Sequence, residues 1–115
     1  MNQGESQYAV PTDGAEVLTE AFGLVTGPRQ KQYDHPAEDY QKVVDIFCAF
    51  TGHRLSVYEA LLFMVSVKMA RLRTSIQRNG EIHHDSLVDA LGYLACINMV
   101  KEYTNTTTFM EAWNG

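Results

Sequence analysis

The stretch SVYEALLFMVSVKMARLRTSIQRNG, residues 56–80, predicts an enclosed helix and with it an all-α fold. It opens with Ser56 and, three residues later, Glu59, the spacing of a capping box in which hydroxyl and carboxylate each satisfy a free backbone N–H. The run LLFMVSVKMARL, residues 61–72, is almost continuously apolar, and the helix is expected to end at Asn79 and Gly80. Because a helix that is apolar on nearly all sides must be enclosed, we expect this helix to be the central one.

Three further helices are predicted around it. Apolar residues at helical spacing mark residues 13–26, 36–51 and 84–103. The second of these opens on a proline, which suits a first helical turn because its missing N–H has no partner there. Gly27 and Gly52 follow the first two helices as stop signals. No strand pattern competes, so the expected fold is a single all-α domain of four helices with short connections.

The two ends of the chain differ from its middle. Residues 1–12 are polar with little periodicity, which predicts a flexible N-terminal arm. Residues 105–115 are rich in threonine, which predicts a C-terminal tail that is weakly helical at best. Residues 13–104 are therefore expected to form the helical domain.

Composition narrows the possible functions. The chain has 115 residues and a formal net charge of -5, which argues against binding to nucleic acid because phosphate neutralisation needs clustered positive charge. No apolar run approaches the roughly 20 residues that span a bilayer, and the N-terminus carries no targeting pattern, so we expect a cytoplasmic protein without membrane contact. Cys48 and Cys96 lie in apolar helical settings, which favours buried thiols over a disulfide.

The connector RQKQYDHP, residues 29–36, is the first polar cluster. Alternate positions along it carry Arg29, Lys31, Tyr33 and His35, so their side chains could face one anion near the start of the following helix. The alternative is a solvated loop in which His35 or Asp34 caps that helix, and composition alone favours this alternative.

The second cluster lies within the opening stretch. Lys68 and Arg71 continue the spacing of three and four residues begun by Val57, Leu61 and Met64, so two cations extend an apolar seam. A buried cation needs a partner because an unpaired ammonium is very costly inside a protein. The alternative is that both long side chains reach back to the surface.

The third cluster is acidic. Asp85, Asp89 and Tyr93 share one face of the last helix, and the two carboxylates repel unless a cation lies between them. Lys68, Arg71 or Mg²⁺ could supply it, with Glu59 as a third carboxylate. The alternative assigns Asp85 to the helix N-cap and Asp89 to the helix dipole. Gly92, inside the same helix, suggests a close approach of another helix.

Taken in order, the runs EAFGLVTGPRQKQYDHPAEDYQKV, MVSVKMARL and HHDSLVDALGYLA resemble a family of small phage-encoded all-α domains of unknown function. The resemblance covers about residues 18–96. Two positions depart from the family pattern: Asp34 stands where the family has glycine, and Tyr58 stands where the family has the first of two adjacent acids. The polar pattern of the family falls on Glu20, Arg29, Gln30, Tyr33, His35, Pro36, Glu59, Lys68, Arg71, Asp85, Asp89 and Tyr93.

More distantly, the family is similar to the all-α nucleotide pyrophosphatases of the MazG type and to helical domains associated with phage nucleotide modification. Those relatives imply nucleotide ligands, magnesium and homo-oligomers with sites between subunits. The resemblance thus implies ligand contacts from Arg29, Tyr33, His35, Lys68, Arg71 and Tyr93, and magnesium contacts from Glu59, Asp85 and Asp89.

Two functions follow as hypotheses. The first is a homo-oligomer that binds a nucleotide or another phosphate-bearing small molecule, with Mg²⁺ as a possible cofactor. Catalysis is less favoured than binding because the chain has fewer acids than the pyrophosphatase pattern requires, and no catalytic residue is assigned. The second is a non-enzymatic protein that acts on a host or phage protein, in the cytoplasm of the host bacterium if a phage encodes it.

Overall fold

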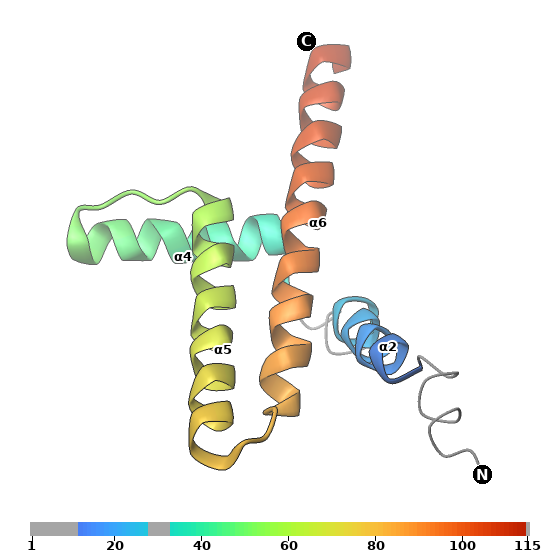
Figure 1. Cartoon of the computed structure of the whole chain (residues 1–115). Helices are drawn as coiled ribbons and strands as arrows, with labels where there is room; N and C mark the ends of the chain where they lie inside the picture. The colour runs from blue at the N-terminus through green and yellow to red at the C-terminus, as the bar shows by residue number, and fades with distance from the viewer. Residues whose placement is uncertain (1–11, 28–32, 115) are drawn as a thin grey trace.

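The computed structural model describes residues 12–27 and 33–114, with side chains placed for residues 14–27 and 33–104. Within these ranges the chain forms four α-helices and no strand: α2 (Thr12–Thr26), α4 (Pro36–Thr51), α5 (Val57–Asn79) and α6 (His84–Asn114) (Figure 1). The prediction of an all-α, four-helix fold is confirmed. None of the described helices is long and apolar enough to cross a membrane.

The ends of α5 form as its sequence predicts. The Ser56 hydroxyl accepts from the backbone N–H of Glu59 at 3.0 Å, and Glu59 Oε1 accepts from the backbone N–H of Ser56 at 2.8 Å. Gly80 ends the helix with φ +68°, a left-handed conformation that costs glycine little. Gly52 ends α4 in the same way with φ +77°. Local signals therefore fix where the helices begin and end.

The central helix is α6, not α5 as the apolar run predicts. α6 contacts each of the other three helices, whereas α2 contacts only α6 among the described elements. α5 and α6 lie side by side as an antiparallel hairpin, and α4 crosses that hairpin on one side (Figure 1). The apolar run of α5 exceeds what its neighbours cover, so Leu62, Phe63 and Met69 stay exposed.

The core lies where the hairpin meets α4 and α2. Leu61 of α5 packs with Cys96 and Val100 of α6, and Tyr40 of α4 and Val25 of α2 pack against them. Fully burying a leucine of this kind contributes roughly 1.5–3 kcal/mol relative to leaving it exposed. This core holds the four helices in one domain.

Residues 105–114 correct a second expectation. α6 continues through them to Asn114, although their threonine content predicts a tail that is weakly helical at best. Threonine lowers helix propensity by only a few tenths of a kcal/mol per residue. The sequence has no glycine or proline between Gly92 and Gly115, so no strong stop signal interrupts α6 before the end of the chain.

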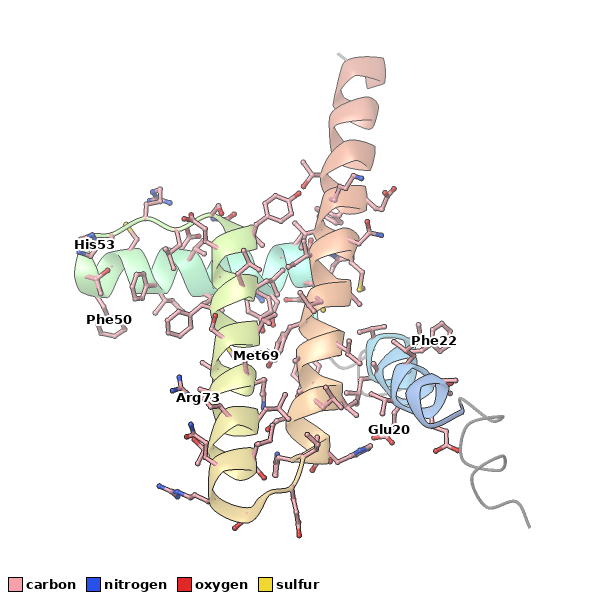
Figure 2. All side chains as sticks on the ribbon, viewed as in Figure 1. Glu20, Phe22, Phe50, His53, Met69 and Arg73 are labelled. Atoms are coloured by element: carbon pink, nitrogen blue, oxygen red, sulfur yellow. The ribbon has the colours of Figure 1, made fainter. Side chains whose placement is uncertain are left out.

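α2 is tied to the start of α6 by an ion pair. Both carboxylate oxygens of Glu20 lie 2.9 Å from Nε2 of His84, and Figure 2 shows Glu20 on α2. The hydrogen bond to Glu20 and its negative charge raise the pKa of His84 above its ordinary value of 6.5. Since α2 contacts no other described helix, this pair should influence how α2 docks.

We predict that replacing Glu20 by Gln lowers the pKa of His84 toward 6.5. Because the pair raises the pKa in the folded state, its stabilisation is complete below the unfolded pKa of about 6.5 and is lost as pH rises through the folded pKa. NMR titration of His84 in the wild type and in Glu20→Gln measures the shift. Glu16→Gln removes the same charge from α2 and should leave His84 unchanged. A wild-type His84 that titrates at or below its ordinary value contradicts the prediction.

Candidate functional site

A cavity of about 320 Å³ lies where the four helices meet, and each of them contributes to its wall. This volume is at the lower end of the range of small-molecule pockets, roughly 300–1,000 Å³. Apolar and polar groups both line it, so the cavity can hold a ligand with a flat apolar part and several polar atoms. The lining residues are Leu24, Val25, Tyr33, Asp34, Pro36, Asp39, Tyr40, Lys68, Asp89, Gly92, Tyr93 and Cys96.

An ion pair between α5 and α6 forms one wall. Lys68 Nζ lies 2.9 Å from Asp89 Oδ2, and the Lys68 side chain is only 14% exposed. Because Lys68 continues an apolar face of α5, its ammonium is expected to need a partner, and Asp89 is that partner. This partly buried ion pair joins α5 to α6 at the cavity.

Tyrosines form the second feature of the wall. The rings of Tyr40 and Tyr93 meet edge to face with centroids 6.4 Å apart, a favoured arrangement of aromatic pairs. Burial raises the pKa of Tyr40 well above its ordinary value of 10, with a further contribution from Tyr93. The Tyr40 hydroxyl therefore stays protonated at neutral pH and can donate a hydrogen bond. Tyr33, which is exposed, adds a third ring to the lining.

Gly92 and Cys96 line the cavity from α6. A Cβ atom added at Gly92 would meet no atom within 4 Å, so the close helix approach expected at this glycine is wrong. The missing side chain instead leaves space in the cavity. Cys96 is buried, and burial raises the pKa of its thiol, so the thiol stays protonated rather than acting as a nucleophile.

The charges of the cavity are mainly negative. Asp34, Asp39 and Asp89 line it together with one described cation, Lys68. Asp34 also pairs with Lys42, whose side chain is largely exposed. A bare phosphate would thus meet three carboxylates, whereas hydroxyl and amine donors or a bound divalent cation would be favoured.

Of the predicted site residues that the structure describes, four do not line this cavity. His35 caps α4, since its Nδ1 accepts from the backbone N–H of Ala37 at 3.0 Å, and its ring stacks on Tyr103. This confirms the capping alternative for His35. Glu59 serves the capping box of α5, and Arg29 lies outside the described residues.

The other two predicted residues lie on α5 and α6. Arg71 lines a second, shallower hollow with Arg78 and His83, apart from the cavity that contains Lys68. Asp85 is exposed in the first turn of α6, and His83 rather than Asp85 accepts from a backbone N–H there, that of Ser86 at 3.3 Å. Across the described part of the chain, no group of three His, Cys, Asp or Glu side chains is placed to hold a metal.

Sequence reasoning missed several lining residues. Tyr40 and Asp39 belong to the first turns of α4, and Leu24 and Val25 to the end of α2. Tyr40 fits the apolar spacing of its helix, which hides its hydroxyl as a candidate for binding. The signal that could have found it is a tyrosine at a core position of an amphipathic helix, because a buried tyrosine hydroxyl usually has a partner.

We predict that Lys68→Met lowers the free energy of unfolding by about 1–2 kcal/mol, because Asp89 loses its partner while remaining partly hydrated. Urea denaturation measures the change. Lys42→Met is the matched control: its pair with Asp34 is exposed on both sides and screened by water, so the loss should be clearly smaller than in Lys68→Met. Equal losses in the two variants would show that the Lys68–Asp89 pair is no stronger than a surface pair.

Comparisons with known proteins identify the family. The model of the family described as Domain of unknown function (DUF6378) matches residues 16–101. Gene 55 protein of Mycobacterium phage D29 is 29% identical over 86 residues, which are 75% of this chain and 54% of that protein. The chain therefore spans about half the length of the curated relative that it matches. No solved structure matches the chain.

These matches confirm a resemblance to a domain of unknown function with a phage-encoded relative, and the likeness to MazG-type pyrophosphatases stays a prediction. The family match extends from α2 into α6 and so includes every helix that lines the cavity. On this match, the chain belongs to the DUF6378 family of domains of unknown function.

Proposed function

We propose that this domain binds a nucleotide or another phosphate-bearing small molecule, with Mg²⁺ as a possible bridge, and that it acts as a homo-oligomer. The observation that carries the proposal is the cavity of about 320 Å³ in which tyrosine rings lie beside the Lys68–Asp89 pair. Pockets of this kind combine an apolar wall with a few polar groups that fix the orientation of the ligand.

Each part of the wall suits one part of such a ligand. A nucleobase contacts the rings of Tyr33, Tyr40 and Tyr93, since aromatic faces bind flat rings. Ribose hydroxyls donate to the carboxylates of Asp39 or Asp89. The phosphate lies toward solvent, because the cavity is small and its carboxylates repel an anion.

Magnesium would reconcile a phosphate with this acidic wall. Mg²⁺ is usually held by one or two carboxylates together with waters and phosphate oxygens, so it does not need three protein ligands. Asp34, Asp39 and Asp89 are the carboxylates that line the cavity. We propose binding without hydrolysis, because hydrolysis of the pyrophosphatase type uses more carboxylates in one place than the described residues bring together.

A thermal-shift panel of mono-, di-, tri- and cyclic nucleotides, each with and without Mg²⁺, tests the proposal. A ligand that binds only the folded state raises Tm, and a bridging metal makes that rise depend on Mg²⁺ for phosphate-bearing ligands. We expect a rise with at least one phosphate class. An unchanged Tm across the whole panel contradicts the proposal.

Gly92→Leu separates binding in this cavity from binding elsewhere. The leucine side chain enters space that no atom occupies within 4 Å of its Cβ, and replacing a helical glycine favours folding by up to ~1 kcal/mol. The variant should fold and lose the nucleotide-dependent rise in Tm. Gly23→Leu, the same change at an exposed glycine of α2, should keep it.

A protein partner is the second candidate, favoured by the surface of α4. Val43, Ile46, Phe47 and Phe50 follow a spacing of three and four residues on one face, and Phe50 is 85% exposed. An apolar stripe of this kind is typical of a docking surface. Affinity capture with wild type, with Phe50→Ser and with a chain lacking residues 105–115 tests it. A partner that all three chains retain would exclude the apolar face of α4 and residues 105–115 as its binding surfaces.

A further inference from the structure

The described part of the chain does not cover its own apolar surface. Val44 and Leu61 are its only large apolar side chains with exposure below 2%. Apolar side chains on α5 therefore remain in contact with water when the chain is alone.

These side chains form a regular seam along α5. Its positions are spaced by four and three residues in turn, the repeat that brings two helices together in a coiled coil. The seam extends about 27 Å at the rise of an α-helix. Four of its side chains are between 38% and 53% exposed, one is half-buried and one is already buried. In chain order the seam consists of Tyr58, Leu62, Val65, Met69, Leu72 and Ile76.

The described elements cover this face of α5 only in part: Leu72 is buried within the monomer and Val65 is half-buried, whereas the other four seam residues are exposed. α4 crosses α5 on one side only, and the opposite side is open (Figure 1). Met69 and Arg73 lie on α5 beyond that crossing, toward the turn that leads into α6 (Figure 2). The seam is thus available to another molecule along much of its length.

The charges on one flank of the seam fit a second copy of this chain as the partner. Glu59 and Arg73 each follow a seam residue by one position, so both lie on the same flank of α5. Ser66 lies on that flank midway between them, seven residues from each. If a second copy of α5 runs antiparallel and the two helices cross near Ser66, Glu59 of one copy lies opposite Arg73 of the other. The same contact then forms at both ends of the pair, so the charges are complementary.

We propose that two copies of this chain pair through α5 in antiparallel orientation around a two-fold axis near Ser66. The apolar layers of this arrangement are Leu62 with Leu72 of the second copy and Val65 with Met69 of the second copy. Tyr58 pairs with Ile76 of the second copy at each end. The two α5–α6 hairpins form a four-helix bundle, with α4 of each copy on the outside.

α6 enlarges the interface. A stable protein interface covers roughly 800 Å² per partner, which is more than one helix face supplies. Leu87, Leu91 and Leu94 repeat the spacing of four and three residues on α6, and Leu94 is exposed. The pairing extends the homo-oligomer part of the proposed function and does not depend on its ligand.

Analytical ultracentrifugation of the ligand-free chain tests the interface. The wild type is expected to sediment as a dimer, and Met69→Glu as a monomer, because two carboxylates would be buried near the axis. Phe63→Glu is the matched control: Phe63 is exposed on α5 but outside the seam, so its replacement leaves the dimer intact. A monomeric wild type, or a dimer that Met69→Glu does not dissociate, overturns the proposal.

A charge exchange tests the antiparallel register. Glu59→Lys alone and Arg73→Glu alone each place like charges at both ends of the homodimer and should weaken dimerisation by about tenfold. When the two variants are mixed, both ends regain opposite charges, so the mixed dimer should exceed its statistical share, even though Glu59→Lys also removes the carboxylate of the capping box. Native mass spectrometry measures the fractions of the three dimers. A statistical mixture of dimers overturns the antiparallel pairing. Either result leaves the nucleotide panel on wild type as an independent test of the ligand.

Discussion

The fold depends on covering α6 on more than one side. Ser86, Val88, Ala90 and Gly92 are all buried, although residues two positions apart on a helix point in different directions. One neighbouring helix cannot cover such a surface, so α5, α4 and α2 each take part of it. The missing side chain of Gly92 also leaves space that becomes part of the cavity.

Because α5 covers only one part of α6, many of its own apolar residues stay outside the core. α5 uses Val57 and Leu61 to pack within the monomer. Lys68, further along the same face of α5, pairs with Asp89 of α6. Met69, next to Lys68, belongs to the seam that stays exposed. The monomer covers one apolar surface of this helix, and the proposed dimer would cover the second.

Much of the fold could be predicted from the sequence, because local signals determine helix ends. The Ser56–Glu59 capping box, Pro36 and the two C-terminal glycines act within one helical turn, so single residues reveal them. Which of the helices is the central one could not be predicted from such local signals. Whether an apolar run is enclosed depends on what packs against it: among the described helices α6 contacts three others and α5 contacts two.

The site was predictable where a buried charge required a partner and unpredictable where a polar side chain had two possible roles. Lys68 and Asp89 meet because an unpaired ammonium in an apolar seam is too costly. His35 and Glu59 fit a ligand site and a helix cap equally well by type and spacing, and the backbone N–H groups beside them decide for the cap.

Adjacent residues of α5 connect the cavity to the proposed dimer. Lys68 faces the cavity and Met69 belongs to the exposed seam, so one rotation of α5 about its axis would move both. A second copy packed on the seam would fix that rotation and hold the Lys68 ammonium against Asp89. The same pairing would reduce the conformational freedom that a ligand must otherwise remove, which favours binding by preorganisation. Dimerisation and ligand binding would then be coupled, and by linkage a ligand that contacts Lys68 would strengthen the dimer by the same factor.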